Sequence, residues 1–261
     1  MVDEAKRKVA LAQIREHIAQ KGRHIYVVAG GAATPRYAYT IGVSESIGAE
    51  LILAGASFYL NDDVPPILND IATQLKPQLG WEAMKFEVAG QGSFTLRKAH
   101  ASWATEFMRG ALDYYDVREV PAFQVVPDKV HWTIDVPDLS VPWSATREPV
   151  WRWMHEPWTY PVSEGVVAAT DLAALRGERV TEAMRWEENE WEIFVGDGPN
   201  IPEDELRTVP LGTLVGADES LVPVVHLAVG EGLLRDDPDT EWRPWPNRKR
   251  EGGVAGSGRI Q

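Results

Sequence analysis

Six histidines and several paired carboxylates are the side chains that could carry acid–base or metal chemistry. No two histidines are spaced as His-x-x-x-His or His-Glu-x-x-His, the spacings of a helical zinc site. His226 lies in an apolar run, and we interpret it as a residue of the core or its rim. His131, before Trp132, is interpreted as a turn residue. Paired acids such as Asp62-Asp63 and Asp236-Asp237 occur in predicted loops and helix starts, where carboxylates are ordinarily solvated. These residues therefore predict neither a metal site nor a cofactor.

Other catalytic patterns are equally incomplete. Gly30-Gly31 and Gly90-Gln91-Gly92 lack the further glycines or the lysine of a phosphate-binding loop. Ser44 lacks the second glycine of a nucleophile elbow. The chain contains no cysteine, which excludes disulfides, thiolate nucleophiles and cysteine-ligated zinc. We predict a protein that is not an enzyme.

The acidic stretch over residues 185–198 has a pattern that favours binding. Trp191, Ile193 and Val195 alternate with other residues at the period of a half-buried strand, so Trp191 is expected to point inward. Acidic side chains on a rigid strand are suited to docking a cationic surface. The candidate partner-binding residues are Trp186, Glu187, Glu188, Glu190, Glu192, Asp197, Glu203 and Asp204.

Net charge supports the same hypothesis. The chain carries −13 overall, and residues 146–261 hold 12 Lys/Arg against 22 Asp/Glu. Such a surface repels phosphate backbones, so nucleic acid is not an expected partner. The charge either keeps the protein soluble or attracts a basic protein partner. Because no window approaches the roughly 18 apolar residues of a membrane span, we expect a cytoplasmic protein. The sequence leaves the oligomeric state open.

The chain is predicted to fold as two α+β domains with mainly antiparallel sheets and a few packed helices. The first domain covers residues 1–145, a connector rich in Trp and Pro covers 146–164, and the second domain covers 165–245. We interpret the connector's rings as packing between the domains. Residues 246–261 lack apolar periodicity and are predicted to be disordered.

Local patterns predict the elements of each domain. In the first, helices are expected over 4–20, 61–79 and 102–115, and strands over 24–28, 37–43, 51–55, 85–88, 93–97 and 123–126. In the second, strands are expected over 166–169, 179–185 and 191–195, with short helical segments over 206–211 and 221–227.

A pocket in the first domain is the competing hypothesis. Two tyrosines on one side of a predicted strand could line it, although we expect them to pack in the core against the first helix. The candidate pocket residues are Tyr37, Tyr39, Glu50, Gln124 and Asp128. This alternative would make the protein an enzyme or a small-molecule sensor.

The first domain resembles the bacterial domain-of-unknown-function family 4262. The motifs are Tyr37-x-Tyr39-Thr40-Ile41-Gly42, Glu50-Leu51-Ile52 with Gly55, Leu68-Asn69, residues 124–128 and Pro142-Trp143. Ala49 stands where that family usually has proline. The resemblance implies an α+β fold and no assigned reaction.

The second domain resembles domain-of-unknown-function family 2185, an immunity-protein-like domain of bacterial polymorphic toxin systems. The motifs are Arg179-Val180, Met184-Arg185, Trp191-x-x-Phe194-x-Gly196-Asp197, Leu211-x-x-Leu214, Asp218-x-x-Leu221-x-Pro223-Val224 and Gly230. Residues 187–190 are short for the family. The resemblance implies a non-enzymatic binding domain that neutralises a toxin. The leading hypothesis is therefore an immunity-type protein that masks a basic partner, with a structural role in a larger assembly as a third option.

Overall fold

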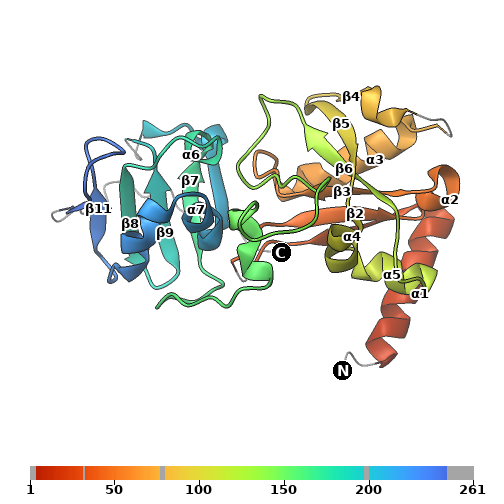
Figure 1. Cartoon of the computed structure of the whole chain (residues 1–261), viewed down its shortest axis with the longest axis horizontal. Coiled ribbons are helices and arrows are strands. Elements are labelled where there is room, and N and C mark those ends of the chain that lie inside the picture. Colours follow the sequence, from red (N-terminus) through yellow and green to blue (C-terminus); the bar gives the residue numbers. More distant parts are fainter. Residues whose placement is uncertain (1–3, 32, 77–79, 197–199, 246–261) are drawn as a thin grey trace.

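The computed structural model describes residues 4–31, 33–76, 80–196 and 200–245. Two mixed β-sheets, each covered by short helices, lie side by side along the long axis of the molecule (Figure 1). Within the described residues each sheet has six strands, four antiparallel pairings and one parallel pairing. The predicted α+β class with mainly antiparallel sheets is confirmed.

The first sheet has the strand order β1-β2-β3-β6-β5-β4, with β3 and β6 as its parallel pair. Its strands are β1 (His24–Val28), β2 (Tyr37–Ile41), β3 (Glu50–Ala54), β4 (Lys85–Val88), β5 (Gly92–Lys98) and β6 (Ala122–Pro127). β3 is buried along its whole length, because it is central and has a helical layer on each side.

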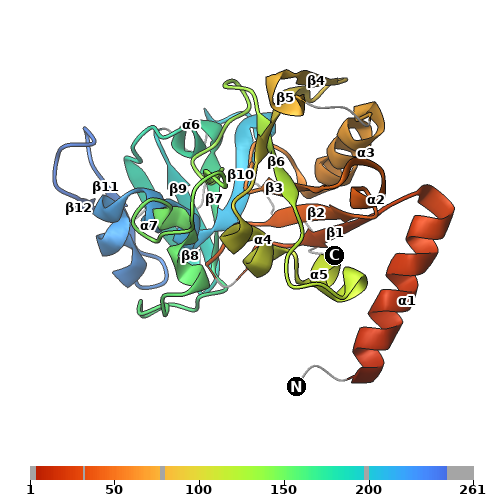
Figure 2. The same ribbon diagram turned by 45° about the vertical axis from the view of Figure 1, so that its right-hand side comes forward.

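Helices cover both faces of this sheet. On one face, α3 (Val64–Gln74) packs against inward residues of β3, β5 and β6. On the other, α4 (Ala101–Phe107) and α5 (Arg109–Tyr115) pack against β2 and β3. The short elements α2 (Ser44–Ile47), η1 (Asn61–Asp63) and η2 (Trp81–Ala83) lie in the connections. α1 (Glu4–Lys21) buries only Ile14 and leans away from the body (Figure 2).

Two predicted helices of the first part differ from the structure. The helix expected over 61–79 ends at Gln74, and residues 77–79 lie outside the described part of the chain. The helix expected over 102–115 is broken at Met108, where the backbone leaves helical geometry. The break brings the Tyr39 hydroxyl to 3.0 Å from the Gly110 N–H, which donates to it. A side chain at Gly110 would collide with that hydroxyl.

The second sheet has the order β10-β7-β9-β8-β11-β12, and β7 and β9 are its parallel pair. Its strands are β7 (Val167–Asp171), β8 (Glu182–Glu187), β9 (Glu190–Phe194), β10 (Leu206–Pro210), β11 (Gly232–Leu234) and β12 (Arg243–Pro244). The helical elements of this part are α6 (Leu172–Leu175), η5 (Glu203–Glu205), α7 (Leu211–Ala217) and η6 (Glu219–His226).

The prediction of a helical segment over 206–211 was wrong. β10 is an edge strand that pairs with β7, and α7 begins only at Leu211. Pro210 ends the strand at an edge, where its missing N–H costs no ladder bond. Val209 points into the core as a strand residue would.

The connector joins the two parts through aromatic side chains. Trp151, in η3 (Pro149–Met154), is buried in the core of the first part and donates its ring N–H to the Asp135 carbonyl at 2.9 Å. Trp158 packs on the core of the second part. η3 also contacts α7. Gly212 of α7 lies against the backbone between β1 and β2, where a Cβ would be 2.5 Å from the Ala33 carbonyl oxygen. Glycine thus permits a close approach that any side chain would prevent.

None of the helices in the described part of the chain has the length and apolarity that a bilayer crossing requires.

Candidate protein-docking face

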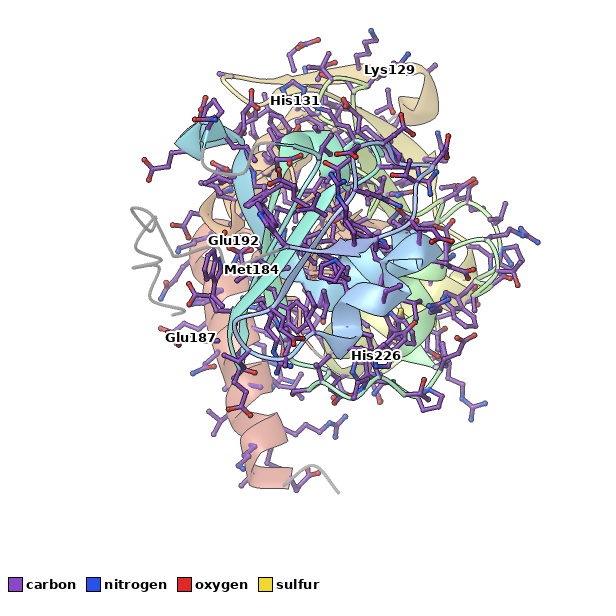
Figure 3. All side chains as sticks on the ribbon, turned by 90° about the vertical axis from the view of Figure 1, so that its left-hand side faces the viewer. Lys129, His131, Met184, Glu187, Glu192 and His226 are labelled. Carbon is purple, nitrogen blue, oxygen red and sulfur yellow. The ribbon has the colours of Figure 1, made fainter. Side chains whose placement is uncertain are left out.

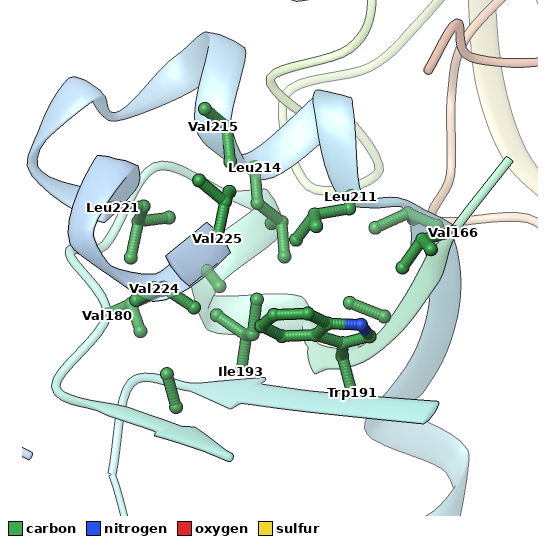
Figure 4. Close-up of a cluster of buried hydrophobic side chains, with 14 of the residues drawn as sticks. Val166, Val180, Trp191, Ile193, Leu211, Leu214, Val215, Leu221, Val224 and Val225 are labelled. Carbon is green, nitrogen blue, oxygen red and sulfur yellow. The ribbon is translucent and has the colours of Figure 1, made fainter. Parts of the chain in front are cut away.

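The hairpin of β8 and β9 has one side in the core of the second part. Trp191 and Ile193 are 1% and 0% exposed and contact the apolar residues of α7 and η6 (Figure 4). The inward position of Trp191 agrees with the strand pattern in the sequence. Trp191 cannot therefore serve as a surface anchor, because its ring is enclosed by the core.

The opposite side of the hairpin carries the acidic residues. The ladder places Glu182 opposite Phe194, Met184 opposite Glu192, and Glu187 opposite Glu190. Because paired residues of a ladder share a side of the sheet, these six side chains project together. With Glu188 in the turn they form a surface that we call the acidic face: Glu182, Met184, Glu187, Glu188, Glu190, Glu192 and Phe194. Figure 3 shows Glu187, Met184 and Glu192 on one side of the strands and His226 of η6 on the other.

The acidic face has no helical layer among the described elements. None of its residues belongs to the three core clusters of the described structure, whereas α6, α7 and η6 all contribute to the cluster on the other side of the sheet. Glu187 and Glu188 are exposed on this face, and Glu182, Glu190 and Glu192 are half-buried.

Electrostatics on this face are unbalanced. Glu187, Glu188 and Glu192 form no ion pair with any residue that the structure describes. Glu187 and Glu190 face each other directly across the ladder, an arrangement of like charges that destabilises a sheet.

Apolar side chains lie between the carboxylates. Met184 and Phe194 are 4% and 6% exposed, and Trp186 is half-buried where the β8 register shifts. Met184 and Phe194 are therefore buried within the protein, and only Trp186 adds apolar surface beside the carboxylates.

Arg185 holds the hairpin in place from the core side. Its guanidinium donates to the Leu227 carbonyl at 2.8 Å and to the Glu188 carbonyl at 3.0 Å, and it lies 5.0 Å from the centre of the Trp191 ring. The only arginine of the segment therefore anchors backbone atoms and neutralises none of the carboxylates on the acidic face.

The remaining candidate partner-binding residues lie elsewhere. Glu203 and Asp204 are exposed in η5, which precedes β10 at the end of the sheet opposite the β8–β9 turn. Asp197 lies outside the described residues. The structure thus brings together Trp186, Glu187, Glu188, Glu190 and Glu192 from the predicted set, and separates Glu203 and Asp204 from them.

The candidate pocket residues of the first part form contacts within the fold. The rings of Tyr37 and Tyr39 are stacked in line with Phe107 and Tyr26, and Tyr39 is 1% exposed. Gln124 is buried, donates to the Pro137 carbonyl at 2.6 Å and accepts the Leu139 N–H at 3.1 Å. Both arrangements organise the interior of the fold.

Glu50 is fully buried, and its hydrogen bonds are made within the protein. Its carboxylate accepts from the Thr40 and Tyr115 hydroxyls at 2.5 Å each, and from the N–H groups of Gly42 and Ser44 at 3.0 Å each. Burial raises the pKa of this carboxyl above its ordinary value, while the four hydrogen bonds act in the opposite direction. Glu50 therefore anchors the connection between β2 and β3.

Asp128 lies in a loop with His131, a pairing that the sequence did not suggest. The Asp128 carboxylate accepts from the ring of His131 at 2.7 Å and from the N–H groups of Ser93 and Val130 at 2.9 and 3.0 Å. Burial raises the pKa of Asp128, but these donors outweigh it and hold the pKa at about 2. The ring fits because residue 92 is glycine: a Cβ there would lie 2.4 Å from His131.

A cavity of about 520 Å³ opens between the two parts of the molecule. Its lining includes Arg97, Trp132, Arg147 and Glu148, and none of the five candidate pocket residues. Arg97 is paired with Asp138 at 3.3 Å, and burial raises the pKa of Glu148. The charged lining comes from β5 (Arg97), from the residues between β6 and the connector (Asp138) and from the connector (Arg147 and Glu148). Sequence patterns gave no reason to combine these segments.

No group of three or more metal-ligating side chains occurs within residues 4–31, 33–76, 80–196 and 200–245.

Comparisons with known proteins bear on the first part of the chain. No curated protein and no solved structure matches the sequence. The resemblance of the second part to an immunity-protein-like family stays a prediction. Residues 17–131 match the family model described as "Domain of unknown function (DUF4262)", so the predicted resemblance of the N-terminal part to this family is confirmed.

Proposed function

We propose that this chain is a docking protein that binds a basic protein partner on the acidic face. The observation that carries the proposal is the group of carboxylates of Glu187, Glu188 and Glu192, which share one side of the hairpin and form no ion pair with a described residue. A lysine or arginine of a partner would find carboxylates on both strands.

Charge and apolar surface would contribute differently to the complex. The carboxylates would steer a cationic surface and raise its association rate roughly 10- to 1000-fold at low salt. Trp186 would supply the contact that resists dissociation, since a well-buried tryptophan at an interface is worth about 2 kcal/mol or more. Association is then fast and sensitive to salt, while dissociation depends on the aromatic contact.

An immunity-type role is the specific form of this proposal. The resemblance of the second part to an immunity-protein-like domain supports it, and so does the absence of a recognised catalytic motif in the sequence. The partner would be a toxin whose basic surface is masked by the acidic face.

Affinity capture from the native host tests the proposal. The variant bait carries Glu187, Glu188, Glu190 and Glu192 replaced by Lys. A control bait carries the same change at Glu45, Asp62, Glu87 and Glu119, which are exposed on the first part and form no ion pair with a described residue. We expect one basic protein to be retained by the wild-type and control baits, lost from the variant bait and eluted by salt. Retention by all three baits would contradict the proposal.

Small-molecule binding is a second candidate function, favoured by the cavity between the two parts. Arg147 forms no side-chain hydrogen bond or ion pair with a described residue and lines the cavity near Trp132 and the half-buried Glu148. A ligand carrying a carboxylate and an aromatic ring would suit these groups. Aromatic carboxylates should then raise the melting temperature of the wild-type protein and leave that of Arg147→Ala unchanged; no shift in either protein would exclude this function.

A further inference from the structure

A second cavity lies next to the cavity between the two parts. It has a volume of about 190 Å³ and lies between the residues that follow α6 and the end of α7. Its apolar lining includes Val180, Leu214 and Leu221, which belong to the core shown in Figure 4. Ile134 and Ala217 line both cavities. The two cavities are therefore neighbours that share one wall.

The shared wall ends at the molecular surface. Ile134 is half-buried, and its N–H donates to the Leu175 carbonyl at 2.8 Å, which fixes it against the second part. Ala217, the last residue of α7, is exposed and carries only a methyl group. Because the wall ends in so small a side chain, an extended ligand can lie across it without any movement of the backbone. The two cavities then form one groove, which we call the junction groove and which is lined by Trp132, Ile134, Arg147, Val180, Leu214, Ala217 and Leu221.

The two ends of the junction groove differ in charge. At the smaller cavity, Nε of Arg179 lies 3.8 Å from a carboxylate oxygen of Asp218, and the exposed Glu178 adds a further negative charge. At the larger cavity, Arg147 forms no side-chain hydrogen bond or ion pair with a described residue. The anionic group of a ligand is therefore favoured at the Arg147 end, and its apolar part at the other end.

Glu148 limits what charge alone can contribute. It lines the larger cavity beside Arg147, and its carboxylate accepts the Asp138 N–H at 2.9 Å. Burial raises the pKa of Glu148 above its ordinary value, and the neighbouring Arg147 acts in the opposite direction. A ligand carboxylate would share Arg147 with this carboxyl. An apolar chain must therefore supply much of the affinity.

We propose that the junction groove binds an aliphatic carboxylate of medium chain length. Its head group pairs with Arg147, and its chain crosses Ala217 into the smaller cavity. The inference rests on the second candidate function, small-molecule binding between the two parts, and narrows the class of ligand. A straight chain can fill both cavities, whereas the single ring of an aromatic carboxylate fills only the larger one.

Titration calorimetry with hexanoate, octanoate and decanoate, at concentrations that form no micelles, measures the contribution of the chain. Each methylene that is fully buried adds about fourfold to the affinity. We therefore expect the wild type to bind decanoate at least about tenfold more tightly than hexanoate. Arg147→Gln should weaken the binding of all three ligands about tenfold, because it removes a charge-assisted hydrogen bond. Arg118→Gln is the control and should stay within about twofold, since Arg118 is exposed and forms no ion pair with a described residue.

Ala217→Phe tests whether the chain crosses the shared wall. The larger side chain raises the wall, so decanoate and hexanoate should then bind with affinities within about threefold of each other. Ala10→Phe, at an exposed position of α1, is the matched control and should keep the affinity ratio of the wild type. If the wild-type ratio survives Ala217→Phe, the chain lies elsewhere on the protein and the inference is overturned.

Benzoate separates this inference from the function on which it rests. If benzoate binds the wild type more tightly than Arg147→Gln, but affinity does not rise from hexanoate to decanoate, small-molecule binding stands and this inference is wrong. If neither benzoate nor any of the aliphatic carboxylates binds the wild type, the second candidate function is wrong as well.

Discussion

Replacing Asp128 with Asn tests the role of this carboxylate in the loop that follows β6. In the folded protein the pKa of Asp128 is about 2, against an ordinary value of 3.8. The folded state favours the deprotonated carboxylate more strongly than the unfolded state does. Asp128 therefore contributes its full stabilisation at pH values above 3.8, the ordinary pKa. That contribution is lost as the pH falls through about 2. The shift corresponds to about 2 kcal/mol at pH 7, of which roughly half remains at pH 3.

Urea unfolding of the wild type and of Asp128→Asn at pH 7 and pH 3 measures this contribution. The variant keeps an acceptor oxygen but loses the charge and one of the two carboxylate oxygens that receive the Ser93 and His131 donors. We expect a loss of about 2 kcal/mol at pH 7 and about 1 kcal/mol at pH 3. Asp62→Asn is the control, since Asp62 is exposed and makes no hydrogen bond to a described residue, and should change stability by less than about 0.5 kcal/mol. A loss that is equal at both pH values would refute the reasoning.

Two further variants test the packing of the parts and the buried carboxylate. Gly212→Ala should lower the free energy of unfolding by about 1–3 kcal/mol, because the new Cβ would overlap the Ala33 carbonyl. The control Gly196→Ala should cost much less, because no described atom lies within 4 Å of its Cβ. Equal urea midpoints for the two variants would contradict the close approach of Gly212 to Ala33. Tyr115→Phe removes a hydroxyl from the Glu50 carboxylate and should cost about 1–3 kcal/mol at pH 7. The loss should be smaller at pH 4, because Glu50, whose pKa is raised, takes up a proton there. An equal loss at both pH values would mean that the Tyr115 hydroxyl does not stabilise the charged form of Glu50.

Local patterns predicted those elements whose burial follows a simple period. β1 and β4 were predicted with their observed bounds, and the alternation around Trp191 correctly placed that ring in the core. Such predictions succeed because one buried side of a strand or helix imposes its period on the sequence. The α+β class follows from the order of these elements.

Contacts between distant residues decided what the sequence could not. The break at Met108 depends on the Tyr39 hydroxyl, which lies on another element, and β10 is a strand because β7 offers it an edge. Likewise, Asp128 and His131 are brought together by a turn against Gly92, and no spacing rule distinguishes this pair from ordinary loop residues.

A pairing between strands distant in the sequence also separates the predicted partner-binding residues into two groups. Sequence proximity suggested one surface from Trp186 to Asp204, but the parallel pairing of β7 with β9 sends η5 to the far end of the sheet. Only the carboxylates of the β8–β9 hairpin therefore remain together. A pairing that skips an element along the chain is invisible to local periodicity.

The claim that the carboxylates of the acidic face attract a cationic partner is tested with two matched quadruple variants. The measurement is the affinity of each variant for a fluorescein-labelled nona-arginine peptide. One variant carries Gln at Glu187, Glu188, Glu190 and Glu192, and the other carries Gln or Asn at Glu45, Asp62, Glu87 and Glu119, so the net charge of the two proteins is the same. At 50 mM salt the account predicts that the first variant binds at least about tenfold more weakly than wild type and that the second stays within about twofold. Equal weakening of both variants would show that net charge alone attracts the peptide and that the acidic face is not a docking site.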